Sequence, residues 1–206
     1  SLLDPKATPM DIAQGEGDEN TRVLSPAQRA ARLRRVLDEA ARAADWGAPA
    51  PPGRGRGMAL HEQANSFFAV VAEVDVTPSG FSVQRILVAA DPGHVLNPSG
   101  AEAQIQFCVA FGLSSALFGE LTFNKGRVEQ ENFDSYRVLR LAEMPRVEVR
   151  WVRSGDDAWG GLGEAAVAPI APAVANAIVA AGGPRIRRLP LLKHWPAALA
   201  EREPPR

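Results

Sequence analysis

The sequence predicts an α+β fold in which helices pack on a mixed or antiparallel sheet. Two apolar segments rich in β-branched residues, Phe67 to Val76 and Phe81 to Ala90, flank the turn sequence Pro78-Ser79-Gly80, as in a hairpin. A helical pattern, short strand signals and a second helical pattern follow the hairpin. Strands that are joined directly, rather than separated by helices, favour α+β over a doubly wound parallel sheet.

The first helix is expected to begin at Ser25-Pro26-Ala27-Gln28. Ser25 can cap the helix, proline suits the first helical position, and Gln28 can complete a capping box. Gly47 is expected to end the helix. One helical face is apolar and the arginines, including Arg32, fall largely elsewhere; the apolar residues are Leu33, Val36, Leu37, Ala40 and Ala44.

Asn97-Pro98 predicts the start of a second helix, from about Ser99 to Phe118. Its apolar positions at helical spacing are Ile105, Val109, Leu113, Ala116 and Leu117. Short strands are expected near residues 121–123, 128–130 and 147–152. A last helix is expected from about Pro172 to Ala181.

We therefore divide the chain into four parts. Residues 1–24 are expected to form an irregular lead-in, and residues 25–57 a helix plus a linker or extended arm rich in Pro and Gly. Residues 58–192 are expected to form the main domain and residues 193–206 a tail. The start at Ser1, without Met or a signal sequence, predicts a processed chain or a piece of a longer one.

Composition argues against several kinds of partner. A formal net charge of −1 disfavours binding to nucleic acid or to an anionic membrane. No apolar run reaches the roughly 18 residues that a membrane span needs. The single cysteine, Cys108, cannot form an internal disulfide, and one Cys with three His argues against an all-protein zinc or iron–sulfur site. Cys108 is expected to be a small core residue rather than a nucleophile.

The glycine loop Gly160-Gly161-Leu162-Gly163, with Glu164 directly after it, is the candidate site. The loop lacks the ending of a nucleotide P-loop and the third glycine of a dinucleotide fingerprint. Its glycines predict unusual torsions and a close approach of the backbone to another group. Glu164 precedes an apolar run and is expected to be partly desolvated, which suits a general base. By this local pattern alone, a surface loop acid is the alternative.

Five motifs follow one another in a characteristic order: Asp91 to Pro98, Ala103-Gln104-Ile105, Phe111 to Leu117, Asn132 to Tyr136, and Gly161 to Glu164. Together they resemble the C-terminal half of the xanthine oxidase-type molybdenum hydroxylases. Two further segments, Gly55 to Glu62 and Arg185 to Leu191, are similar to one branch in particular, the large (beta) subunit of isoquinoline 1-oxidoreductase and related aldehyde dehydrogenases.

The resemblance implies a molybdenum-dependent oxidoreductase that oxidises an N-heteroaromatic or aldehyde substrate with oxygen derived from water. Glu164 would be the general base. Residues 58–192 would form the C-terminal part of a molybdenum cofactor-binding domain. The other implied site residues are Gln104, Gly161 and Gly163 on the cofactor, and Phe133 and Tyr136 on the substrate side.

The implied cofactor is molybdenum cytosine dinucleotide, with the metal held through the pterin dithiolene rather than by protein ligands. The glycine- and glutamine-rich loops that hold most of the pterin in relatives are not in this sequence. Cofactor binding is therefore expected to need the remainder of the large subunit, and turnover a small subunit with two [2Fe-2S] clusters. The expected compartment is cytoplasmic or periplasmic.

Two other functions are alternatives. A noncatalytic structural or assembly domain, inactive as an isolated fragment, is suggested by two departures from the family. These are Ala165, where relatives usually have proline, and Gln106-Phe107-Cys108, where they commonly have Glu-Gly-Gly. A hydrolase that uses His61 and Glu62 has no nucleophile motif to support it. The cluster of Arg185, Arg187 and Arg188 is expected to be a solvated face.

Overall fold

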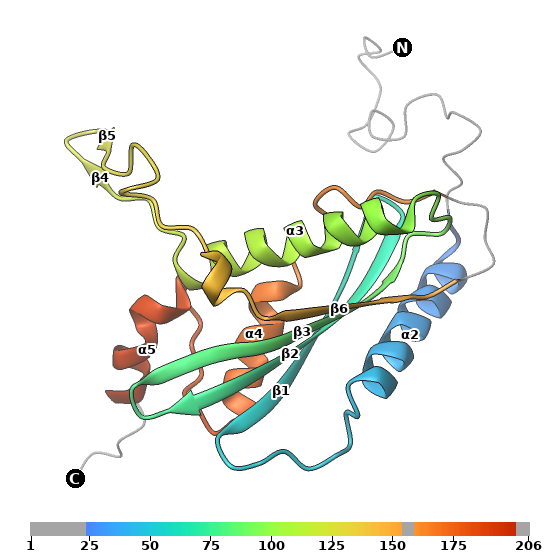
Figure 1. Cartoon of the computed structure of the whole chain (residues 1–206), viewed down its shortest axis with the longest axis horizontal. Helices are drawn as coiled ribbons and strands as arrows, with labels where there is room; N and C mark the ends of the chain where they lie inside the picture. The colour runs from blue at the N-terminus through green and yellow to red at the C-terminus, as the bar shows by residue number, and fades with distance from the viewer. Residues whose placement is uncertain (1–23, 154–158, 201–206) are drawn as a thin grey trace.

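The computed structural model of the chain describes residues 24–153 and 159–200, with side chains up to residue 195. Its centre is a four-stranded sheet of order β1-β2-β3-β6, shown in Figure 1. Strands β1 (Arg54–Gln63), β2 (Ser66–Thr77) and β3 (Gly80–Asp91) are antiparallel, whereas β6 (Arg146–Trp151) runs parallel to β3. The prediction of an α+β fold with a mixed sheet is confirmed.

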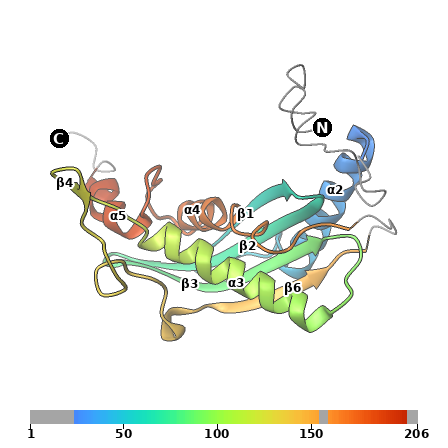
Figure 2. The same cartoon turned by 90° about the horizontal axis from the view of Figure 1, so that it is seen from above.

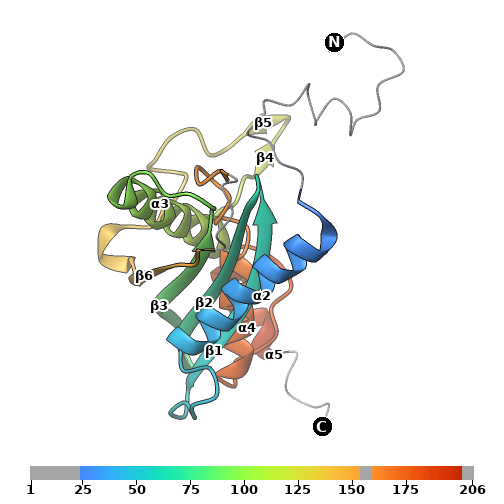
Figure 3. The ribbon, with the colours of Figure 1, turned by 90° about the vertical axis from the view of Figure 1, so that its right-hand side faces the viewer.

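Helices cover both faces of this sheet. Helix α2 (Pro26–Ala43) packs on β2 and β3 from one side, while α4 (Ile170–Ala180) packs on β1 and β2 from the other (Figure 3). Helix α3 (Pro98–Leu117) contacts α4, β6 and α5 (Leu191–Ala200), and Figure 2 shows it along the same side of the sheet as α4. The layers are therefore helix, sheet, helix.

The continuous apolar sequence of β2 follows from this layering. Phe68 and Val70 point into the core formed with α3, α4 and α5, whereas Phe67 and Val71 point into a second core formed with α2. All four side chains are buried. A strand covered on both faces needs apolar residues at every position rather than at alternate ones.

The expected helix starts are confirmed. The Ser25 side chain accepts a hydrogen bond from Gln28 N, and the Gln28 side chain accepts one from Ser25 N, which completes the capping box. The Asn97 side chain caps α3 by accepting from Gly100 N at 3.1 Å.

The expected linker through residue 57 is wrong for its last four residues, because Arg54 to Gly57 belong to β1. The glycines there reflect packing rather than a loop. A Cβ on Gly57 would lie 2.1 Å from the backbone nitrogen of Ala177, and one on Gly55 would lie 2.2 Å from that of Ala181. Strand β1 and helix α4 therefore touch backbone to backbone.

The remaining elements lie toward the C-terminal end of α3. A two-residue hairpin, β4 (Phe123–Asn124) and β5 (Arg127–Val128), projects away from the body, and the 3-10 helix η1 (Leu141–Glu143) leads back to β6 (Figure 1). The expectation of a tail from residue 193 is wrong for residues 193–200, because they belong to helix α5, which begins at Leu191. No helix among the described residues is both long and apolar enough to cross a membrane.

Candidate active site

The glycine loop that precedes Glu164 is fastened to the turn between β1 and β2. Ala64 and Asn65 form this two-residue turn with φ values of 50° and 59°, which is the backbone geometry of a type I′ hairpin. Gly161 N donates to the carbonyl of Ala64 at 2.8 Å, and Ser66 Oγ donates to the carbonyl of Gly161 at 2.7 Å. The β1–β2 turn therefore holds the loop through hydrogen bonds to both the N–H and the carbonyl of Gly161.

Gly160 is the residue at which the loop approaches the turn most closely. Its N–H donates to the carbonyl of Pro92 at 2.9 Å, and a Cβ there would lie 2.2 Å from Ser66 Oγ. The expected close approach is therefore confirmed at Gly160. The three loop glycines do not use their freedom to adopt unusual torsions, because none of them has a positive φ. Gly163 differs from Gly160, since a Cβ there would meet no atom within 4 Å.

A buried ion pair supports the segment around Pro92, whose carbonyl accepts the hydrogen bond from Gly160 N. Arg32 of α2 donates from Nε and from one terminal nitrogen to the carboxylate of Asp91, each at 2.8 Å, and both side chains are almost fully buried. The guanidinium also lies over the ring of Phe67, 4.5 Å from its centroid. Asp91 accepts a further bond from Gly93 N, so the pair fixes the residues on either side of Pro92.

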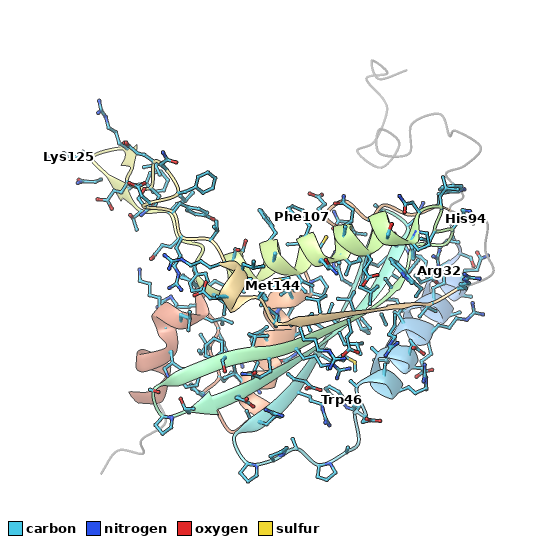
Figure 4. All side chains as sticks on the ribbon, viewed as in Figure 1. Arg32, Trp46, His94, Phe107, Lys125 and Met144 are labelled. Carbon is cyan, nitrogen blue, oxygen red and sulfur yellow. The ribbon has the colours of Figure 1, made fainter. Side chains whose placement is uncertain are left out.

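Sequence reasoning missed this pair by placing Arg32 away from the apolar face of its helix. The buried residues of α2 are Arg32, Val36 and Ala40, which recur every four positions. Figure 4 shows Arg32 between α2 and the sheet. The helical spacing could have identified it, because an arginine in line with a buried stripe needs an acid to pair with.

Cys108 lies under the glycine loop. Its Sγ is 3.8 Å from the carbonyl oxygen of Leu162 and 3.7 Å from that of Gly163, and the residue is fully buried. Burial raises the pKa of the Cys108 thiol, and the nearby Glu164 carboxylate acts in the same direction. The prediction of a core residue is confirmed. Gln104 is exposed and lies one helical turn before Cys108, on the same side of α3.

The Glu164 side chain is exposed and accepts a hydrogen bond from Gln63 Nε2 at 3.3 Å. The expectation that this acid is partly desolvated is therefore wrong for this chain. Ala165 and Ala166, which follow it, are buried and fill the inward positions, whereas Glu164 faces out.

The structure does not bring Phe133 and Tyr136 to Glu164. Phe133 is 81% exposed, and the segment between β5 and η1 that carries both residues lies near the opposite end of α3 from the loop (Figure 1). Their placement on the substrate side stays a prediction. Phe107 projects from α3 away from the sheet and stacks on Phe111, with 5.7 Å between ring centroids (Figure 4).

The residues proposed for a hydrolase are not arranged as a catalytic pair. Glu62 forms an ion pair with Arg29 at 2.7 Å, and His61 Nε2 lies 3.2 Å from Gln63 Oε1. Nucleophilic catalysis needs a nucleophile within hydrogen-bond reach of its base, and the interactions of His61 and Glu62 include none.

The chemistry of the exposed groups around the loop fits a polar organic cofactor such as a pterin. Within residues 24–153 and 159–200, no three His, Cys, Asp or Glu side chains are grouped to hold a metal ion. Gln104 offers an exposed amide, Glu164 an exposed carboxylate, and Gly163 an exposed position with open space where a Cβ would stand. Amide and backbone groups are suited to a polar organic ligand.

We expect Gly160→Ala to expose Cys108. The added Cβ would overlap Ser66 Oγ and the carbonyl of Asn65, so the loop must lift from the turn that holds it. Because the chain has one cysteine, the rate of labelling by a maleimide reports the cover over Cys108 directly. The rate should rise about tenfold or more, since labelling follows exposure of the thiol. Gly163→Ala is the matched control, and equal rates for both variants would contradict the arrangement.

Comparisons with known proteins show the family of the chain. A family model described as a molybdopterin cofactor-binding domain matches residues 14–145. The isoquinoline 1-oxidoreductase subunit beta of Brevundimonas diminuta is 34% identical over 161 residues, which are 76% of this chain and 20% of that protein. The membrane-bound aldehyde dehydrogenase (pyrroloquinoline-quinone) of Gluconacetobacter polyoxogenes is 27% identical over 203 residues, 91% of this chain and 25% of that one.

A solved structure adds agreement on the fold. Quinoline 2-oxidoreductase from Pseudomonas putida 86 superposes with a TM-score of 0.57 at 21% identity, over 67% of this chain and 19% of that chain. The family match covers more than half of the sequence, so the chain belongs to the molybdopterin cofactor-binding domain family. The resemblance to the molybdenum-binding subunits of the xanthine oxidase type is confirmed.

Proposed function

We propose that this chain supplies the general base, Glu164, and one wall of the cofactor site of a molybdenum hydroxylase. The observation that carries the proposal is the way in which the structure holds Glu164. The carboxylate is exposed, yet the loop before it is fastened to the β1–β2 turn and to Pro92. A general base needs this combination of an accessible carboxylate and a fixed position.

In this proposal the side chain of Glu164 accepts a proton, and the glycine loop holds Glu164 in position. Glu164 would take a proton, at a carboxylate oxygen, from the oxygen group that attacks the substrate, while Gly160 and Gly161 keep its backbone in place. When bound, the molybdenum cofactor supplies the oxygen that is transferred and accepts the electrons of the oxidation. The Glu164 side chain faces solvent in this chain, so the remainder of the large subunit has to exclude bulk water from the site.

Gln104, Gly161 and Gly163 would contact the cofactor. The Gln104 amide is free to donate and accept toward a pterin, whereas the backbone N–H and carbonyl of Gly161 are already bonded to Ala64 and Ser66. Gly161 would therefore let the cofactor approach rather than bind it through those groups. The metal would be held through the pterin dithiolene of molybdenum cytosine dinucleotide.

The names of the relatives support a proposal for the substrate class and the partners. An isoquinoline-like heteroaromatic or an aldehyde would be oxidised, as the names of the two relatives indicate for those proteins. One of those names gives pyrroloquinoline quinone, but the family match is to molybdopterin, and we propose the molybdenum cofactor. The chain spans 20% and 25% of these relatives, so the rest of a large subunit and a small [2Fe-2S] subunit would complete the enzyme.

The test is Glu164→Gln in the intact subunit. The variant keeps the size of the side chain and removes its ability to take a proton. Turnover per bound molybdenum should fall by about 10²–10⁴-fold, the usual contribution of a general base. Glu102→Gln is the control, since Glu102 is an exposed acid on α3. Activity of the Glu164 variant within about threefold of wild type would rule out the base assignment.

A noncatalytic assembly domain is the second candidate, and the exposure of Phe133, far from the loop, favours it. Metal analysis of the chain produced together with its upstream segment separates the two functions. Molybdenum at close to one per chain would eliminate the noncatalytic domain.

A further inference from the structure

Gln63 lies between two groups that could act on a proton. Its amide nitrogen donates to Glu164 Oε1 at 3.3 Å, and its amide oxygen lies 3.2 Å from Nε2 of His61. The chain of contacts therefore runs from His61 through Gln63 to Glu164. Neither the fold nor the ion pairs described above explain this arrangement.

The position of Gln63 is fixed by the hairpin that also holds the glycine loop. Gln63 is the last residue of β1 and pairs with Ser66 across the Ala64–Asn65 turn. Ser66 Oγ in turn bonds the carbonyl of Gly161. The turn thus holds the backbone of Gln63 and the backbone of the loop that leads to Glu164. The two side chains therefore meet from backbone segments that are fixed relative to each other.

The chemistry of an amide suits this place. A glutamine carries a donor and an acceptor on one planar group, so binding on one side fixes its orientation on the other. A His61 ring with a proton on Nε2 donates to the amide oxygen, and this leaves the amide N–H groups facing the carboxylate. With one carboxylate oxygen held, the second is the oxygen available to a proton.

We propose that Gln63 is a positioning residue for the base, and that His61 fixes the orientation of its amide. The inference rests on the proposed function of Glu164 and adds the group that aims it. Gln63 donates one hydrogen bond to Glu164 Oε1 and itself exchanges no proton with the substrate.

The experiment uses the complete enzyme, with its large and small subunits, and measures molybdenum content, kcat and KM. Gln63→Glu has the same shape but loses the donor and adds a like charge, and Gln63→Leu loses both polar groups. Each should lower kcat about tenfold or more, as the loss of a hydrogen bond to a charged group implies. KM and molybdenum content should stay near wild type. His61→Phe should lower kcat by a smaller factor.

Gln84→Glu is the matched control, because Gln84 is an exposed glutamine of β3 that contacts Ser82 rather than the loop. Its kcat should equal that of the wild type. A Gln63 variant that loses molybdenum instead of kcat would indicate a structural role and overturn the proposal. Unchanged kcat in both Gln63 variants would also overturn it.

Combining Gln63→Leu with Glu164→Gln separates this inference from the proposed function. If Gln63 acts through the base, its substitution has no further effect once Glu164 is lost. An equal loss in both backgrounds would show that Gln63 acts independently, and would leave Glu164 as the base. Full activity of Glu164→Gln alone would refute both the proposed function and the inference.

Discussion

Replacing Arg32 by methionine is expected to destabilise the chain by about 3–5 kcal/mol. The substitution leaves the carboxylate of Asp91 buried beside the Gly93 N–H without its guanidinium partner. A buried charge that loses its partner keeps its desolvation cost and loses the attraction that offset it. The free energy of unfolding, measured by urea denaturation with circular dichroism, gives the size of the loss.

The same helix provides a matched control. Arg34 also makes two 2.8 Å contacts with a carboxylate, that of Asp38, but its side chain is 73% exposed. Arg34→Met should therefore cost less than about 1 kcal/mol. The double variant Arg32→Met/Asp91→Asn should lose less stability than the two single variants lose together, because both charges of the buried pair are removed. Equal losses for Arg32 and Arg34 would argue against the buried pair.

Gly57→Ala is expected to cost at least about 3 kcal/mol, the upper end of the range for overpacking. The added Cβ would lie 2.1 Å from the nitrogen of Ala177 and 2.2 Å from the carbonyl oxygen of Ala173, and both atoms belong to the backbone of α4. A backbone cannot turn aside as a flexible side chain can. Either α4 moves away from β1 or the strand leaves the sheet.

Thermal unfolding of the purified variant measures this effect, and Gly47→Ala serves as its control. Gly47 is exposed, and a Cβ there would meet no atom within 4 Å. That variant should keep the stability of the wild type within about 0.5 kcal/mol. A Gly57 variant as stable as the Gly47 variant would contradict the backbone contact between β1 and α4.

Much of the fold could be predicted because the sequence patterns are local. The apolar segments around Pro78-Ser79-Gly80 predict the β2–β3 hairpin, and caps at Ser25 and Asn97 predict α2 and α3. The first four residues of β1, Arg54 to Gly57, were harder to predict. Glycine usually weakens a strand, and only the approach of α4, distant in sequence, explains why Gly55 and Gly57 stand in one.

The candidate site could be predicted in part. A motif identifies Glu164, but its exposure depends on which way Ala165 and Ala166 turn, and this is decided by packing under the loop. Gln63 could not be found from sequence, since its contact with Glu164 joins residues about a hundred positions apart. Arg32 could have been found from its four-residue spacing with Val36 and Ala40.

The hydrogen bonds between the glycine loop and the β1–β2 turn also determine the stage at which the loop loses its conformational entropy. Gly160 and Gly161 are bonded to Pro92, Ala64 and Ser66, all at the ends of strands in the central sheet. The entropy of ordering this loop is thus lost once, as the chain folds, and not in every catalytic cycle. For the base that we propose, Glu164, this reduces the entropic cost of activation in each turnover, because its direction is set before the substrate arrives.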